Sequence, residues 1–225
     1  MHIRRGPIIC LLALAVFSSA VHVRVAAQAQ QAKPAGDSKA TAARRATWHL
    51  THSAGARAAA GDTTALARLI DSVQSLGVRS GTGRDRRLHH YVRGLMLAAR
   101  GNDEGAAAEL RRSILSQNFG YTRANYALAR ALMRLGRPAE AVAVLRPALR
   151  GGVEASNLYV TRTELHELLA QAWEATGARD SAAAHYRIVA SAWTRADPAL
   201  RARQTLAGAR AAALAGRRTE LAVGR

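Results

Sequence analysis

The feature that most constrains the fold is a spacing of small, large and glycine residues that recurs along the chain. The first copy consists of Gly94, Leu97, Gly101, Ala106 and Leu110. The same pattern returns 35 positions later, at Ala129, Leu132, Gly136, Ala141 and Leu145. A fixed period of this length is typical of a two-helix unit that stacks on copies of itself.

A third copy follows after a connection that is six residues longer and contains Gly151 and Gly152. Its members are Ala170, Trp173, Gly177, Ala182 and Tyr186. Small residues let two helices approach closely, large ones fill the space between them, and a glycine ends the first helix. Aromatic residues make up only 4% of the chain, whereas hydrophobic residues make up 49%, which favours helices over sheets. We therefore expect an all-α fold.

These residues resemble the tetratricopeptide repeat (TPR) family. The resemblance implies a helical-hairpin solenoid of three to four repeats with a C-terminal capping helix. It also implies a concave groove lined by the first helix of each repeat, where a protein or peptide partner binds. A degenerate copy precedes the three, because Gly61, Leu66, Ile70 and Val73 match a turn and second helix. Arg57 stands where the large residue of its first helix belongs, which argues against that helix.

The pattern divides the chain into six parts. They are a signal peptide (1–29), a flexible leader (30–46), a degenerate helical hairpin (47–77), a basic hinge (78–87), three TPR-like repeats (88–195), and a capping helix with a tail (196–225). In the capping helix Leu200, Leu206, Ala209 and Ala213 share one side, which we expect to be buried. Trp193 is expected to anchor this helix, and Trp173 and Tyr186 to lie in the core.

Polar and glycine residues mark the expected helix boundaries. Helix starts are predicted at Asp62, Asn102, Pro138, Asp180 and Asp197. Helix ends are predicted at Gly61, Gly77, Gly101, Gly136 and Gly177, where a left-handed cap costs least.

The first 29 residues have the pattern of a secretory signal. Arg4 and Arg5 precede an apolar run over residues 8–20, and small residues follow at Ala27 and Ala29. The run is too short for a stable span, so we expect cleavage and no permanent transmembrane anchor, with an uncleaved anchor as the alternative. The only cysteine, Cys10, lies in this segment. We expect an exported bacterial protein, periplasmic or secreted, without a thiol in its mature form.

The formal net charge is +18, almost all of it from arginine. Nucleic acid is a disfavoured partner, because an exported chain would not meet it and stacking aromatics are few. Two explanations stay open. The arginines either reflect the codon composition of the genome, or they form a surface for anionic lipid or polysaccharide.

No catalytic motif is present in the sequence. There is no His-Glu-x-x-His, no Gly-x-Ser-x-Gly and no phosphate-binding loop. His49 and His52 are three apart but have no third metal ligand nearby, and His166 occupies a packing position. The sequence therefore predicts a non-enzymatic scaffold or adaptor, with no cofactor and no metal.

The groove positions follow from the register of the first helices. The candidate partner-binding residues are Tyr91, Leu95, Arg123, Tyr126, Arg130, Met133, Arg134, Glu164, Glu167 and Gln171. With Leu88, Ala98 and Glu174, which share the register, the groove would run from apolar through cationic to acidic.

Tyr91 and Tyr126, one repeat apart, would flank an extended peptide, and the arginines would pair with its carboxylates. The alternative is that all of these are ordinary exposed helix residues. The lysine and asparagine clamp of the family is not matched, so specificity for a peptide terminus is not implied.

Overall fold

The computed structural model describes residues 38–114, 122–150 and 160–223, with side chains up to residue 215. Its helices are α2 (Lys39–Ala59), α3 (Thr63–Arg79), η1 (Asp85–Arg87), α4 (Leu88–Ala99), α5 (Asp103–Ser113), α6 (Thr122–Arg134), α7 (Pro138–Ala148), α9 (Arg162–Ala175), α10 (Arg179–Ala192) and α11 (Pro198–Val223). No strand occurs within these ranges. The predicted signal peptide and the glycine pair of the long connection lie outside them.

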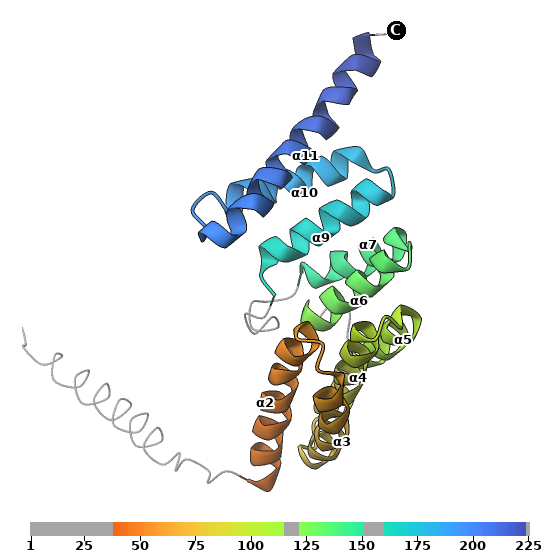
Figure 1. The fold of residues 1–225 in the computed structure, drawn as a ribbon, viewed down its shortest axis with the longest axis vertical. Helices are drawn as coiled ribbons and strands as arrows, with labels where there is room; N and C mark the ends of the chain where they lie inside the picture. Colours follow the sequence, from red (N-terminus) through yellow and green to blue (C-terminus); the bar gives the residue numbers. More distant parts are fainter. Residues whose placement is uncertain (1–37, 115–121, 151–159, 224–225) are drawn as a thin grey trace, which may run out of the picture. The chain divides into compact units, whose positions relative to one another are not determined.

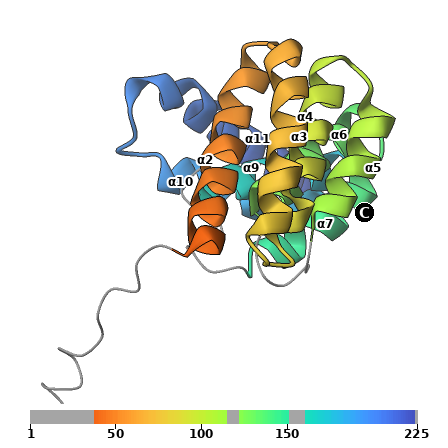
Figure 2. The ribbon, with the colours of Figure 1, turned by 90° about the horizontal axis from the view of Figure 1, so that it is seen from below.

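Consecutive helices pack as hairpins, in the order α2/α3, α4/α5, α6/α7 and α9/α10 (Figure 1). Each second helix also packs on the first helix of the next hairpin, and α10 packs on α11 in the same way. The first helices contact one another as well, α2 with α4, α4 with α6, and α6 with α9. They therefore form one layer, called here the inner layer. Figure 2 shows α2 and α3 running side by side with α4. The all-α hairpin solenoid predicted from the spacing is confirmed.

The repeated small and large residues do pack as the spacing predicts. A Cβ built on Gly94 would stand 2.6 Å from Cγ of Leu110, so only glycine fits there without a shift of the leucine. In the next hairpin the equivalent Ala129 and Leu145 are both fully buried. The turn glycines Gly101, Gly136 and Gly177 have φ between 69° and 80°, which is the left-handed cap expected from the sequence.

A polar pair joins the two helices of each of the three repeats at the same register position. His90 bonds Glu109 at 2.8 Å in the first repeat, and the Asn125 side chain donates to the Val144 carbonyl at 3.3 Å in the second. The third repeat places the Nδ1 atoms of His166 and His185 2.8 Å apart. Each pair spans 19 residues, so the same position of the three repeats holds a polar contact made by different residue types.

The first hairpin is more complete than the sequence predicts. Helix α2 begins at Lys39, so residues 39–46 are helical where a flexible leader was expected. The interpretation that Arg57 argues against a first helix is wrong, because α2 extends through it to Ala59. Because this helix is rich in Ala and Arg, its faces differ little in hydrophobicity, and the sequence does not show which face is buried. Trp48 and Leu50 of this helix nevertheless pack on the core.

The segment interpreted as a basic hinge is an ordered turn. Helix α3 runs through the predicted end at Gly77, and a Cβ there would stand 2.4 Å from the Asp85 carbonyl oxygen. Gly77 is therefore required for the close approach of the turn to the helix, not for a cap. Asp85 is fully buried and accepts a hydrogen bond from Trp48 Nε1 at 2.9 Å.

Two predictions at the C-terminal end are corrected. Helix α10 begins at Arg179 with Ala178 as N-cap, so Asp180 lies in the first turn instead of capping it. In α11 the buried residues are Ala207, Ala211 and Leu214, and Leu200 is partly buried. The predicted face is wrong: Leu206 is 57% exposed, and Ala209 and Ala213 are exposed too. Trp193 is buried beside this helix as predicted.

Candidate functional site

The inner layer of the first repeat is covered by α2. Tyr91 and Arg123, both predicted to face an open groove, are only 7% exposed. The Arg123 guanidinium carbon lies 4.8 Å from the centre of the Tyr91 ring and 5.4 Å from that of Trp48. Leu88 is 2% exposed. The predicted placement of these residues on the open surface is therefore wrong, because Trp48 of the first hairpin fills the groove there.

Trp48 is held in place by charged neighbours. Its indole nitrogen donates to the buried Asp85 carboxylate, whose other oxygen lies 3.9 Å from Nε of Arg44. Burial raises the pKa of Tyr91, and the Arg123 charge lowers it in part. A cation between two aromatic faces is attracted by both, which favours a stable contact over an exchangeable one. We call the Trp48, Arg123 and Tyr91 contact the filled groove.

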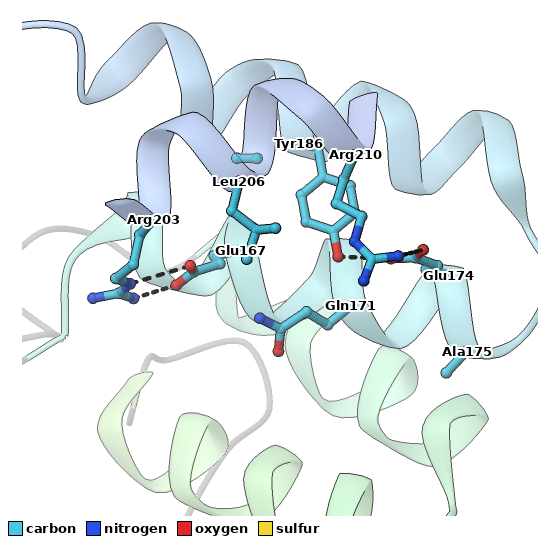
Figure 3. Close-up of a pocket in the computed structure, with 9 residues that line it drawn as sticks. Glu167, Gln171, Glu174, Ala175, Tyr186, Arg203, Leu206 and Arg210 are labelled. Carbon is cyan, nitrogen blue, oxygen red and sulfur yellow. Dashed lines mark hydrogen bonds and ion pairs between the residues drawn. The ribbon is translucent and has the colours of Figure 1, made fainter. Parts of the chain in front are cut away.

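The acidic end of the inner layer is occupied by α11. Arg203 makes a bidentate contact with Glu167, and Arg210 Nη1 lies 3.0 Å from Glu174 Oε1 (Figure 3). Glu174 also accepts a hydrogen bond from the Tyr186 hydroxyl at 2.8 Å. Both ion pairs span 36 residues, so α11 meets α9 with the register of a further repeat. This part of the predicted acidic groove is consequently neutralised.

Two further candidates are engaged in structural contacts. Arg134 pairs with Asp103 of the preceding repeat, Nη2 to Oδ1, at 2.5 Å. Glu164 forms a capping box with Thr161 at the start of α9, where its carboxylate accepts from the Thr161 backbone at 2.7 Å. Leu95 and Met133 are partly buried against the core. All four side chains are thus bonded to or packed against other parts of the chain.

What stays open is a patch made by α6, α9 and α11. Arg130 and Gln171 are exposed, Tyr126 is partly exposed, and Leu206 from α11 is 57% exposed. We call these four residues the open groove. Burial raises the pKa of Tyr126. The charges of Glu164 and Glu167 also raise this pKa, and the charges of Arg130 and Arg203 lower it. Tyr126 therefore lies among charged groups of all three helices.

A shallow pocket adjoins this patch. It has a volume of about 350 Å³, and Figure 3 shows Gln171 and Leu206 on its wall between the two ion pairs. The Glu167–Arg203 and Glu174–Arg210 pairs stand on either side, so an entering side chain meets an apolar surface flanked by charge. Such a surface fits a side chain of a peptide better than it fits an enclosed small molecule.

Sequence reasoning missed the residues that close the groove. Trp48 lies in the helix that Arg57 argues against, and the sequence pattern singles out neither Arg203 nor Arg210 from the other arginines. A signal for the arginines was present, because they stand seven residues apart, as Glu167 and Glu174 do. Within the described residues no group of three or more His, Cys, Asp or Glu side chains is placed to hold a metal ion.

No protein-family model matches the sequence, and no curated protein matches it either. Two solved structures are similar in fold, a Podosopora anserina putative kinesin light chain with nearly identical TPR-like repeats and a variant of it with one substitution. The variant has a TM-score of 0.54 at 18% identity, over 76% of this chain and 87% of its own. The other has a TM-score of 0.52 at 17% identity, over 76% and 88%. The protein thus has a TPR-like helical repeat fold.

Proposed function

We propose that this protein is a non-enzymatic scaffold that binds a peptide or protein segment in the open groove. Repeat folds of this kind present extended surfaces for other proteins, which supports a protein partner in general. The observation that carries the finer proposal is the exposure, in full or in part, of Tyr126, Arg130, Gln171 and Leu206 on three neighbouring helices. Of the other inner-layer candidates, Tyr91 and Arg123 are buried, Arg134, Glu164 and Glu167 are bonded within the chain, and Leu95 and Met133 are partly buried against the core.

The chemistry of the patch defines the segment that it would take. Arg130 offers an unburied guanidinium for an acidic side chain, and Leu206 with the Tyr126 ring offers an apolar contact nearby. An extended segment with an acidic and an apolar residue fits this surface. We propose further that the signal-like segment 1–29 exports the protein, so that its partner is periplasmic or secreted. Within the described residues no helix is both long and apolar enough to cross a membrane.

The proposal is tested by a pull-down from envelope extract with the tagged full-length protein. The groove variant Arg130→Glu/Gln171→Lys places a new charge at each exposed position. Its matched control, Arg146→Glu/Ala143→Lys, makes the same charge changes on exposed residues of α7, outside the inner layer. We expect discrete proteins that bind the parent and the control at moderate salt and are lost with the groove variant. Equal recovery by all three proteins would contradict the proposal.

A further inference from the structure

The two edges of the stack differ in how their charges are arranged. At the turn edge, where each first helix turns into its second helix, arginines and acids alternate and pair. Arg57 lies 3.4 Å from Asp62, Arg134 lies 2.5 Å from Asp103, and Arg137 lies 2.5 Å from Glu140 and 3.3 Å from Glu104. Acids at the start of a helix are favoured by its dipole, so each second helix brings one to this edge.

The opposite edge is where each second helix ends and the next first helix begins. Because helices of a hairpin run in opposite directions, these junctions all come to the same edge. Its exposed arginines include a set of six, which are Arg79, Arg86, Arg150, Arg162, Arg195 and Arg201. The other exposed arginines there, Arg87, Arg111 and Arg112, are bonded to backbone carbonyls or to acids. In the part of the chain that the structure describes, none of these six lies within ion-pair distance of an acid. We call this set the junction edge.

The acids of the junction edge do not neutralise it. Asp85 is fully buried under Trp48, and Glu109 is 8% exposed and already bonded by His90, Arg93 and Arg112. Glu164 is bonded in the capping box of α9. Among the acids that the structure describes at this edge, Asp197, before α11, is the one that is exposed. Within the described residues the junction edge therefore carries six arginines that no acid pairs with, whereas Arg57, Arg134 and Arg137 of the turn edge are all paired.

We propose that the junction edge docks on the surface of an anionic phospholipid bilayer. The arginines stand at three of the four hairpin junctions, α3/α4, α7/α9 and α10/α11, so they are spread along the edge and do not form a pocket for a single anion. Guanidinium groups bind phosphates in a bidentate manner, and a bilayer presents many phosphates in one plane. Beside Arg79, the Val78 side chain is 57% exposed, and an apolar residue within the row can enter the boundary between headgroups and acyl chains.

The inference is independent of the open groove, because the two surfaces share no residue. Arg130 lies on the inner layer, whereas the junction edge is formed by the ends of α3, α7 and α10, by η1, and by the starts of α9 and α11. A bilayer bound at this edge leaves the groove residues unchanged. Failure of lipid binding would not bear on peptide binding, and failure of peptide binding would not bear on lipid binding.

The experiment is co-sedimentation of the full-length protein with vesicles, either pure phosphatidylcholine or phosphatidylcholine mixed with phosphatidylglycerol. The edge variant is Arg79→Gln/Arg86→Gln/Arg150→Gln/Arg195→Gln. The control variant, Arg68→Gln/Arg100→Gln/Arg146→Gln/Arg187→Gln, removes the same charge from exposed arginines elsewhere. Thermal unfolding of both variants checks that the fold is kept, and we expect both to unfold like the parent, since exposed arginines are removed.

We expect the parent to bind phosphatidylglycerol vesicles and not pure phosphatidylcholine, with affinity that falls as salt is raised. The edge variant should bind at least about tenfold more weakly, since each basic residue near an anionic surface contributes on the order of a tenfold change or less. The control variant should stay within about threefold of the parent. Equal losses in both variants would overturn the proposal in favour of distributed charge. Binding to heparin without binding to phosphatidylglycerol vesicles would overturn the assignment to lipid.

Discussion

The two ends of the inner layer are closed by different physical means. At the N-terminal end, Trp48 of α2 covers the first repeat, and Arg123 is held between two aromatic rings in a nearly buried setting. At the C-terminal end, α11 covers the third repeat through the ion pairs Glu167–Arg203 and Glu174–Arg210, which are partly exposed.

Packing and desolvated hydrogen bonds contribute several kcal/mol and resist salt, whereas exposed ion pairs contribute little and are screened. We therefore expect the filled groove to stay closed, and we expect the contacts of α11 with α9 to be the ones that binding of a partner would change.

The largest expected effect comes from breaking the filled groove. Trp48→Ala removes the ring that covers Arg123 and leaves the buried Asp85 carboxylate without its indole donor. We expect a loss of about 3–5 kcal/mol in the free energy of unfolding, measured by urea denaturation. Trp48→Phe keeps a ring and loses only the donor, so its cost should be smaller. If both substitutions lower the free energy of unfolding by the same amount, the aromatic ring, which Phe retains, is not what stabilises the filled groove.

The next effect concerns the approach of the turn to α3. Gly77→Ala would place a Cβ against the backbone of Asp85, and we expect a cost of about 1–3 kcal/mol in urea denaturation because backbone has to move. Gly55→Ala in the neighbouring helix α2 is the matched control. No atom lies within 4 Å of a Cβ there, so a gain of up to about 1 kcal/mol is expected from helix propensity. Destabilisation by both substitutions would show that the close contact is not the cause.

The ion pairs at the other end predict a smaller effect that depends on salt. Glu167→Gln removes the partner of Arg203, whose side chain is about one third exposed. We expect faster amide hydrogen exchange in α11 at low salt and a smaller difference from the parent at high salt. Glu104→Gln, whose carboxylate is 68% exposed, is the control and should leave α11 unchanged. A Glu167→Gln effect that is the same at both salt concentrations would argue against a screened contact.

The smallest effect concerns pH and the pair of histidines in the third repeat. Burial, followed by the charges of His185 and Arg162, lowers the pKa of His166 to about 4, and burial lowers the pKa of His185. The folded state thus keeps both rings neutral, while the unfolded chain binds protons near pH 6.5. The stability contributed by this difference is present above about pH 6.5 and is lost as the pH falls toward 4.

His166→Asn tests this, since Asn125 fills the same position in the second repeat. The drop in the urea midpoint between neutral and mildly acidic pH should be smaller for this variant than for the parent. An identical drop would mean that other groups cause the acid sensitivity. His49→Asn, at an exposed position of α2, is the control and should behave like the parent.

The repeats could be predicted from the sequence because their pattern combines spacing with residue size. Gly94 opposite Leu110 and the caps at Gly101 and Gly136 follow from local geometry, and the structure confirms them. The faces of α2 and α11 could not be predicted in the same way. In helices built from Ala and Arg every face has similar hydrophobicity, so tertiary contacts of Trp48 or Arg203 decide which side is buried.

The groove residues show the same limit. The register placed the candidates on the first helices, but whether such a residue is free depends on what a distant segment brings to it. Trp48 covers the Arg123 and Tyr91 pair from an earlier hairpin, and α11 brings Arg203 to Glu167 from a later one. Arg130 and Gln171 remain exposed, since neither helix covers them. Which of the candidate residues stay exposed therefore depends on how all the hairpins stack, and cannot be read from any single repeat.

The most direct test of the scaffold proposal is photo-crosslinking in the cells that make the protein. A photoreactive residue is placed singly at Gln171 in the open groove, and at Ala143 on the exposed face of α7 as the control. If a partner binds in the open groove, discrete crosslinked protein adducts form from position 171, are absent from position 143, and are reduced by Arg130→Glu in the same chain. The same adducts from both positions, or none from position 171, would contradict the proposal.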